Sequence, residues 1–137
     1  MAHSIKAAHQ RGIAIILDIV LNHFGPDDLD DCLCRFDGWF KNGGDGIYFY
    51  NDKRSHTAFG SRPDYGRDEV RHYLLDCALF WLQEYHVDGL RFDSTVNIRN
   101  VKGNNNDPQN DLVDGWNLMR WINDDVDKKS GLEIYNC

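Results

Sequence analysis

The stretch VDGLRFDS, residues 87–94, is a short apolar segment that also carries an arginine and two aspartates. It follows a long helical pattern directly and predicts a β-strand. Side chains alternate along a strand, so Leu90 and Phe92 should face one way. Arg91 and Asp93 should share the opposite face, where the guanidinium can hold the carboxylate ionised and oriented. This stretch alone fits a structural ion pair at a sheet edge equally well.

The elements around this stretch alternate between helices and strands. In chain order the sequence predicts a helix, a strand, a long loop, a helix, a strand, a loop, a helix and a strand, at residues 4–10, 13–24, 25–68, 69–86, 89–95, 101–111, 112–129 and 132–137. Strands that alternate with helices of this length imply βαβ units and a parallel sheet. The strand at 13–24 is apolar almost throughout, so it is expected to be buried on both faces.

The two long helices are both predicted to be amphipathic. The inward side chains of the first should be those at helical spacing, namely Val70, Leu74, Cys77 and Trp81, supported by Tyr73 and Phe80. Those of the second should be Trp116, Met119, Ile122 and Val126.

Polar side chains gather where the first two predicted strands end. Asp18, Asn22 and His23 close the first strand, and Arg91 and Asp93 lie on the second. In barrels and open parallel sheets alike, the carboxyl ends of the strands carry the active site. The five side chains are therefore expected to converge, which favours a functional site over a structural ion pair.

Composition and charge exclude several classes of function. The 137 residues carry a formal net charge of −7, and no basic patch stands out, so nucleic acid and anionic membranes are poor partners. No apolar run is long enough to span a bilayer, and no signal-peptide pattern opens the chain. Cys32, Cys34, Cys77 and Cys137 lack zinc-finger spacing and are expected to be reduced thiols in a cytoplasmic protein.

Two motifs carry a resemblance to a known family. DIVLNH, residues 18–23, and DGLRFD, residues 88–93, resemble the first two signature regions of the α-amylase superfamily, glycoside hydrolase family 13. Further similarity, to the glycogen branching enzymes of that family, covers residues 56–60, 64–93 and 114–123. The resemblance implies an α/β fold that forms part of a TIM (β/α)8 barrel. Residues 1–137 would be a single partial catalytic domain, with a loop excursion over residues 24–68.

The resemblance also implies a reaction and a role for each site residue. The family carries out a retaining double displacement at α-glucosidic bonds, so an α-glucan or maltooligosaccharide is the expected substrate. Asp93 matches the nucleophile, and Arg91 the arginine that keeps it charged. His23 matches a histidine that hydrogen-bonds the sugar, and Asp18 an aspartate that braces the arginine. Asn22 matches an asparagine that ligates calcium in many amylases but not in branching enzymes, so it is expected to be structural, with no metal and no cofactor bound.

A retaining mechanism needs a second carboxyl group about 5–5.5 Å from the nucleophile. In this family the second group is a glutamate at the end of the next strand, whereas Glu133 is expected at the start of that strand and is not assigned. We therefore expect an internal fragment, inactive alone, whose partner is the remainder of the barrel. Loop aromatics could stack on glucose rings, although each could equally pack in the core: Trp39, Tyr48, Phe49, Tyr50 and Phe59.

Several alternatives stay open within and outside this family. Amylases usually have a histidine at the position of Asn97, and branching enzymes a tryptophan at that of Phe59, while DYGR at residues 64–67 favours branching enzymes. Glycogen branching leads, ahead of a maltooligosyl-trehalose trehalohydrolase or an amylase-type hydrolase, and of a degenerate glucan-binding relative. A magnesium-dependent phosphoryl-transfer site is disfavoured, because no glycine-rich phosphate loop is present.

Overall fold

The computed structural model describes residues 1–24, 46–130 and 133–136, with the side chains of residues up to 128. Trp39, Cys32, Cys34 and Cys137 lie outside the described residues. The elements in chain order are α1 (Ala2–His9), β1 (Ile16–Ile19), β2 (His56–Thr57), β3 (Gly60–Ser61), α2 (Asp68–Gln83), β4 (Gly89–Phe92), α3 (Thr95–Arg99), the 3₁₀ helix η2 (Pro108–Asn110), α4 (Val113–Ser130) and β5 (Glu133–Asn136).

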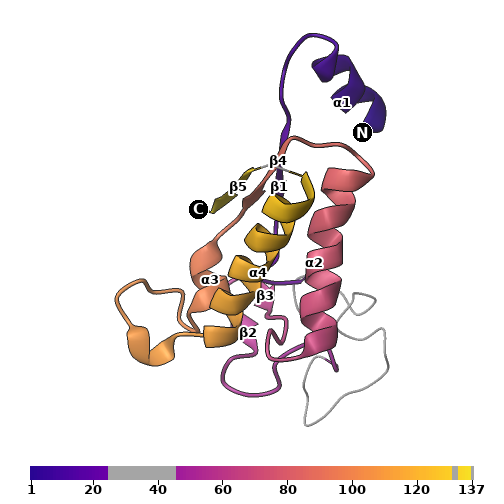
Figure 1. Ribbon diagram of the computed structural model, residues 1–137. Helices are drawn as coiled ribbons and strands as arrows, with labels where there is room; N and C mark the ends of the chain where they lie inside the picture. The colour runs from indigo at the N-terminus through magenta and orange to yellow at the C-terminus, as the bar shows by residue number, and fades with distance from the viewer. Residues whose placement is uncertain (25–45, 131–132, 137) are drawn as a thin grey trace.

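In the described part of the chain, β1, β4 and β5 form a parallel sheet in that order. β1 pairs with β4 from Ile16↔Gly89 to Ile19↔Phe92, and β4 pairs with β5 from Gly89↔Glu133 onward. The predicted alternation of strands and helices is therefore found. Figure 1 shows α1 at one end of the sheet, with α3 and the β2–β3 hairpin at the opposite end, where the strands finish.

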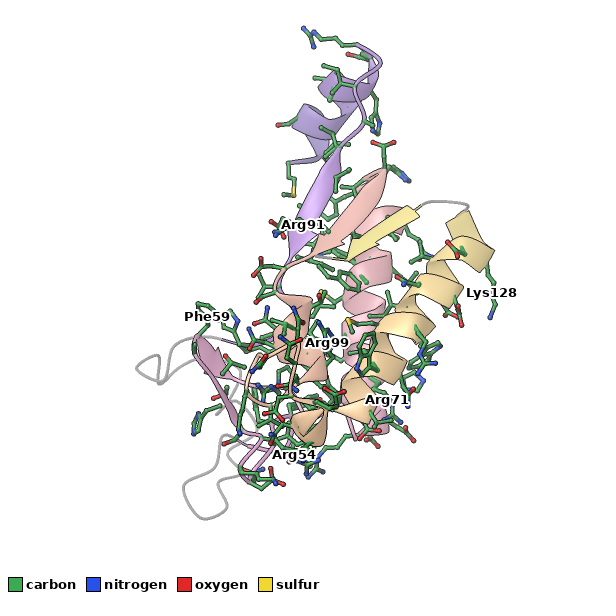
Figure 2. All side chains as sticks on the ribbon, turned by 90° about the vertical axis from the view of Figure 1, so that its left-hand side faces the viewer. Arg54, Phe59, Arg71, Arg91, Arg99 and Lys128 are labelled. Carbon is green, nitrogen blue, oxygen red and sulfur yellow. The ribbon has the colours of Figure 1, made fainter. Side chains whose placement is uncertain are left out.

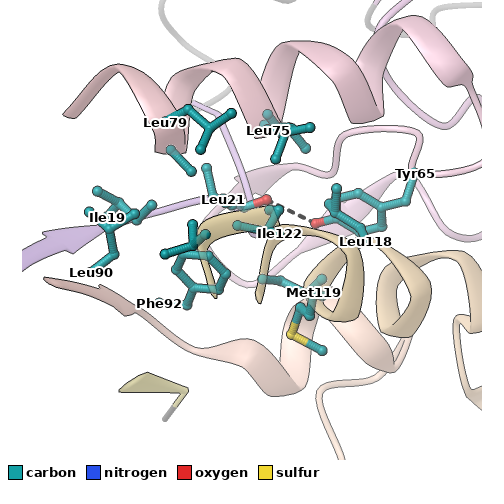
Figure 3. Packing of buried hydrophobic residues seen from close by; sticks show 14 of the residues in the cluster. Ile19, Leu21, Tyr65, Leu75, Leu79, Leu90, Phe92, Leu118, Met119 and Ile122 are labelled. Carbon is teal, nitrogen blue, oxygen red and sulfur yellow. Dashed lines mark hydrogen bonds between the residues drawn. The ribbon is translucent and has the colours of Figure 1, made fainter. Parts of the chain in front are cut away.

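Helices α2 and α4 cover one face of this sheet and form the core with it (Figure 3). Leu90 and Phe92 of β4 are fully buried against them, as the strand alternation predicts. On α2 the buried positions form one stripe, Val70, Leu74, Leu75, Ala78, Leu79 and Leu82. On α4 they are Leu118, Met119, Ile122 and Val126. In the described residues, no helix combines the length and the apolar character needed to cross a membrane.

The prediction that the first strand is buried on both faces is wrong for the described structure. Ile19 and Leu21 are buried, but Ile13, Ile16 and Val20 are 53%, 54% and 45% exposed. The physical reason is that the described helices lie on one side of the sheet only. Alternate residues of β1 therefore point to a face that no described element covers.

The segment between β1 and α2 was predicted as a loop and contains a short hairpin. β2 and β3 pair antiparallel through His56↔Ser61 and Thr57↔Gly60. Ser61 also bridges to Phe24, which lies five residues after the end of β1. The hairpin is thereby fixed at the carboxyl end of the sheet, beside the predicted site.

The loop aromatics divide between the core and the surface. Phe49 and Tyr50 are each 1% exposed, so both pack in the core and neither is free to stack on a sugar. Tyr48 is half-buried. Phe59 lies 56% exposed in the hairpin turn and remains available to a ligand.

Candidate active site

Arg91 lies between two carboxylates on the uncovered face of the sheet. The β1–β4 register places Asp18 opposite Arg91. Nη1 of Arg91 donates a hydrogen bond to Oδ2 of Asp18 and another, 3.2 Å long, to Oδ1 of Asp93. The predicted pairing of Arg91 with Asp93 is thus present, and Asp18 does contact the same guanidinium. One arginine orients both carboxylates from neighbouring strands.

The backbone around Asp93 turns sharply from strand to helix. The Asp93 N–H donates to the carbonyl of Ile19 at 3.0 Å, which extends the β1–β4 pairing by one residue. Ser94 then adopts a left-handed conformation, with φ of 50°, and α3 begins at Thr95. Such a conformation at a residue with a Cβ costs about 1–3 kcal/mol, and residues of this kind cluster at active sites and ligand-binding turns. The turn places Asp93 directly after the end of β4, two residues before the start of α3.

Asn22 connects His23, which follows β1, to the turn at Asp93 and Ser94. Its buried side chain donates from Nδ2 to the backbone carbonyl of Asp93 at 2.9 Å. That bond orients the amide, so Oδ1 of Asn22 accepts from Nδ1 of His23 at 2.6 Å. His23 Nδ1 therefore carries the hydrogen, and Nε2 of a neutral ring is the acceptor. Asn22 thereby fixes the orientation of His23.

The charge state of His23 is set by two opposing effects. Burial lowers the pKa of His23 below its ordinary value, and the nearby Asp93 charge opposes this in part. Desolvation is the larger of the two effects. It lowers the pKa because it disfavours the charged imidazolium form. A neutral His23 near pH 7 can exchange hydrogen bonds with the hydroxyl groups of a ligand.

An open pocket of about 470 Å³ lies at this end of the sheet. Its lining residues are Phe59, Arg91, Asp93, Ser94, Thr95, Val96, Arg99 and Asn105. Figure 2 marks Phe59 on the β2–β3 turn and Arg99 at the end of α3, both beyond the strand end that carries Arg91. The Phe59 ring also contacts His23, with ring centroids 5.6 Å apart.

Sequence reasoning missed five lining residues: Ser94, Thr95, Val96, Arg99 and Asn105. Arg99 donates a hydrogen bond to Oδ1 of Asn105, which ties the end of α3 to the loop that follows. The asparagine-rich stretch at residues 104–106 was the only signal in the sequence, and it predicts a loop rather than a site. An aromatic ring, guanidinium groups, a carboxylate and an amide around one open pocket suit a hydroxyl-rich ligand with apolar ring faces.

Two other residues that the sequence analysis discussed, Glu133 and Asn97, do not line this pocket. Glu133 opens β5 and pairs with Gly89, at the opposite end of the sheet from Asp93, as expected. Asn97 lies near the site, where its Nδ2 donates to Oγ of Ser94 at 2.9 Å. Within residues 1–24, 46–130 and 133–136, no three His, Cys, Asp or Glu side chains are grouped to hold a metal ion.

Comparison with known proteins gives relatives that are similar in sequence. The chain is 35% identical over 132 residues to the 1,4-α-glucan branching enzyme GlgB of Photobacterium profundum, covering 89% of this chain and 18% of the relative. It is 46% identical over 93 residues to GlgB of Cellvibrio japonicus, covering 66% of this chain and 12% of the relative. No family model matches the chain.

Two solved structures share the fold. Pullulanase type I from Bacillus subtilis str. 168, complexed with maltose, superposes with a TM-score of 0.68 and 23% identity over 98% of this chain and 16% of that protein. The maltogenic α-amylase AmyB from Thermotoga neapolitana superposes with a TM-score of 0.61 and 21% identity, over 98% of this chain and 27% of that protein.

Arg91 and Asp93 thus lie at the strand end of a fold that is shared with the pullulanase and α-amylase structures. The sequence of the chain is similar to the 1,4-α-glucan branching enzymes. The chain spans less than a fifth of the length of these relatives, 18% and 12% respectively.

Proposed function

We propose that the chain is part of the catalytic (β/α)8 barrel of a retaining α-glucan-active enzyme, and that this enzyme forms α-1,6 branches in glycogen. The observation that carries the proposal is the placement of Arg91 between Asp18 and Asp93 at the carboxyl end of parallel strands. The similarity to branching enzymes supports the reaction. On this proposal residues 1–137 make up one partial domain, and its partners are an α-glucan and the rest of the barrel.

In the proposed reaction Asp93 is the nucleophile. Its carboxylate attacks the anomeric carbon of an α-1,4-linked glucose, and the bond to the leaving oxygen breaks as an acid outside the described residues supplies a proton. The covalent glycosyl ester is then attacked by the 6-hydroxyl of another glucan chain, which loses its proton to the same group. Two inversions at one carbon leave the α configuration and create an α-1,6 bond.

The other site residues prepare Asp93 and the sugar for this reaction. Arg91 aims the Asp93 carboxylate through a hydrogen bond, and Asp18 holds the guanidinium from the neighbouring strand. His23, oriented by Asn22, hydrogen-bonds the sugar hydroxyl groups. Because these groups converge on one pocket, the reacting bond would be positioned as well as polarised.

A cellular compartment for the enzyme can also be proposed, from the state of one of its cysteines. Cys77 is a free thiol, half-buried on α2. Burial raises the pKa of this thiol, which keeps it protonated and unreactive near pH 7. Free thiols of this kind fit a reducing compartment such as the cytoplasm.

The test is a product analysis of the full-length protein with linear amylose. Anomeric proton NMR measures α-1,6 bonds, and a reducing-sugar assay measures hydrolysis. Branching predicts new α-1,6 bonds with few new reducing ends. Reducing ends without α-1,6 bonds would instead show hydrolysis, as in an amylase or trehalohydrolase, and glycogen binding with no product would show a non-catalytic relative.

A pair of variants assigns the reaction to this site. Asp93→Asn should lower turnover at least about 10³-fold while glucan binding persists, because the amide cannot form the glycosyl ester. Asp76→Asn, an exposed position on α2, is the matched control and should leave turnover unchanged. Turnover by Asp93→Asn within tenfold of the parent would show that Asp93 is not the nucleophile.

A further inference from the structure

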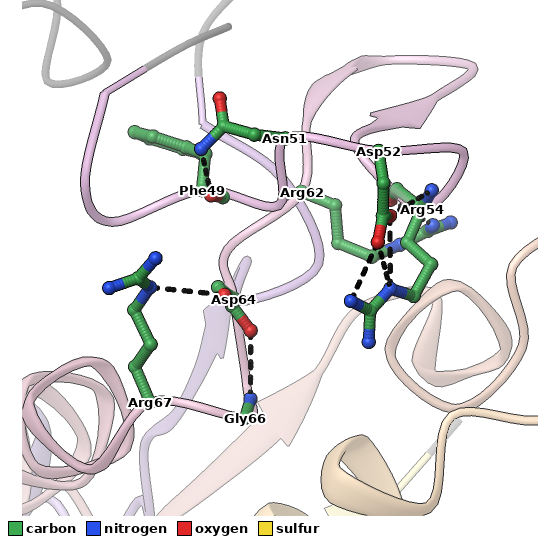
Figure 4. Close-up of polar contacts among 8 residues, drawn as sticks. All are labelled: Phe49, Asn51, Asp52, Arg54, Arg62, Asp64, Gly66 and Arg67. Carbon is green, nitrogen blue, oxygen red and sulfur yellow. Dashed lines mark hydrogen bonds and ion pairs between the residues drawn. The ribbon is translucent and has the colours of Figure 1, made fainter. Parts of the chain in front are cut away.

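Arg62 is a fully buried arginine in the segment that follows the β2–β3 hairpin, and its guanidinium binds three separate parts of the backbone. Nε donates to the carbonyl of Asn97 at 3.0 Å, and Nη2 to that of Val101 at 2.9 Å. Nη1 donates to the carbonyl of Arg54 at 2.6 Å. The side chain therefore joins α3, the turn after it and the loop before the hairpin. Arg62 lies behind residues 51–54 in Figure 4.

The environment of Arg62 is unusual for a buried cation. It is 0% exposed, and in the described part of the chain no carboxylate lies within ion-pair distance of it. Burial lowers the pKa of the guanidinium from its ordinary value, yet arginine remains charged in proteins at all ordinary pH values. Three carbonyl dipoles therefore stabilise the charge. The planar guanidinium carries donors on all three nitrogens, so one side chain reaches all three carbonyls at once.

The carbonyls of Asn97 and Val101 lie at the end of α3, where backbone acceptors lack partners within the helix. A cation at a helix carboxyl end also interacts favourably with the peptide dipoles. An isolated helix of five residues, the length of α3, is not stable in water. The hydrogen bonds from Arg62 thus give α3 the carbonyl partners and the stability that a helix of this length lacks on its own.

The backbone of the same segment reaches the other half of the site. The carbonyl of Ser61 accepts from the N–H of Phe24 at 3.0 Å, directly after His23. The N–H of Arg62 donates to the carbonyl of Ser55 at 2.7 Å. Residues 61–62 therefore hold the segment that follows β1 through the backbone, and α3 through the Arg62 side chain.

We propose that Arg62 is a positioning residue for the reaction, clamping α3 so that the Ser94 turn aims Asp93 at the substrate held by His23. The inference rests on the proposed function. Arg62 itself lines neither the pocket nor the carboxylate cluster, so it acts through the backbone and not on the substrate. Loss of the clamp would let Asp93 move while its binding partners stay intact.

The test compares Arg62→Lys with Arg67→Lys in the full-length protein. Arg67 is a matched control, because its side chain is 39% exposed and its guanidinium pairs with Asp64 near the same hairpin (Figure 4). A lysine at residue 62 keeps the charge but cannot reach three carbonyls. We expect kcat for branching to fall about ten- to a hundredfold with KM within about twofold, as for a misaligned reacting group. Amide exchange at residues 95–101 should become faster, and the control should change neither quantity.

Two results would overturn the inference. One is an Arg62→Lys protein whose kcat per folded molecule and exchange at residues 95–101 both match the parent. The other is a parent protein in which the amides of α3 are unprotected, because a clamped helix must resist exchange; this measurement needs no variant. Amide exchange does not depend on catalysis. If the parent fails to act on glucans, the proposed function fails, while faster exchange in Arg62→Lys still supports the clamp and unchanged exchange still overturns it.

Discussion

Gly115 gives a prediction whose sign depends on two competing energies. It lies in the first turn of α4, where α4 crosses α3. A Cβ added at residue 115 would lie 1.9 Å from the carbonyl oxygen of Ile98 and 2.8 Å from the carbonyl carbon. Carbon–oxygen contacts between packed helices are about 3.3 Å or longer, so Gly115→Ala must separate the two backbones by roughly 1.4 Å.

The two terms act in opposite directions. Replacing glycine by alanine inside a helix stabilises it by up to about 1 kcal/mol. Overpacking a dense contact costs about 1–3 kcal/mol, and the upper end applies here because a backbone carbonyl cannot rotate away as a side chain can. The clash therefore exceeds the propensity gain, and we expect α3 to lose about 1–2 kcal/mol of local stability.

Hydrogen exchange by mass spectrometry on the full-length protein measures this loss directly. A loss of that size speeds exchange of the α3 amides about five- to thirtyfold. Asn117→Ala is the control, since it removes another poor helix former from an exposed position of α4 and should leave α3 unchanged. Exchange of α3 that stays the same or slows in Gly115→Ala would refute the packing argument.

Three further predictions follow from the contacts around the site. Arg91→Lys should lower kcat at least tenfold without preventing folding, because a point charge cannot replace the guanidinium that orients two carboxylates; steady-state kinetics against linear amylose checks this. Tyr65→Phe should lower the unfolding free energy by about 1–3 kcal/mol, since the buried hydroxyl donates to the Leu21 carbonyl at 3.0 Å (Figure 3) and its loss leaves that carbonyl unpaired; urea denaturation measures the loss. His23 should titrate below its ordinary pKa of 6.5 by NMR, so its contribution to stability is full above that pH and is lost as the pH falls toward the lowered folded-state pKa. A His23 pKa at or above 6.5 would contradict the burial argument.

Parts of the site could be predicted because they depend on local periodicity. The period of two along a strand separates Leu90 and Phe92 from Arg91 and Asp93 whatever the rest of the fold does. Parallel pairing then brings Asp18 opposite Arg91, because both lie near the carboxyl ends of their strands. The Arg91–Asp93 contact follows from the first rule, whereas the Arg91–Asp18 contact was implied by the family resemblance and depends on the register of the two strands.

Other features depend on tertiary contacts that periodicity does not encode. Tyr73, Phe80 and Trp116 were predicted to face inward but are 41%, 47% and 39% exposed. The apolar arcs of α2 and α4 are wider than the part of each helix that the sheet covers. The rotation of each helix about its own axis is therefore decided by packing. On α2 the aliphatic stripe that includes Leu75 and Leu79 takes the buried side.

Arg62 is a further case of this kind. A single arginine between a hairpin and a proline normally indicates an exposed loop. Its burial depends on carbonyl groups of α3 and of the turn that follows, 35 and 39 residues further along the chain. The left-handed turn at Ser94 was likewise not predictable, because no glycine or asparagine marks it.

The measurement that tests the central claim most directly is covalent labelling of the full-length protein with a ring-fluorinated α-maltosyl fluoride. Fluoride leaves without help from an acid, and the electron-poor sugar slows the second displacement, so the glycosyl ester accumulates. Peptide mass spectrometry should find one maltosyl adduct on Asp93, which is absent in Asp93→Asn. An adduct on another carboxylate, or none in a protein that turns over amylose, would contradict the assignment of Asp93 as the nucleophile.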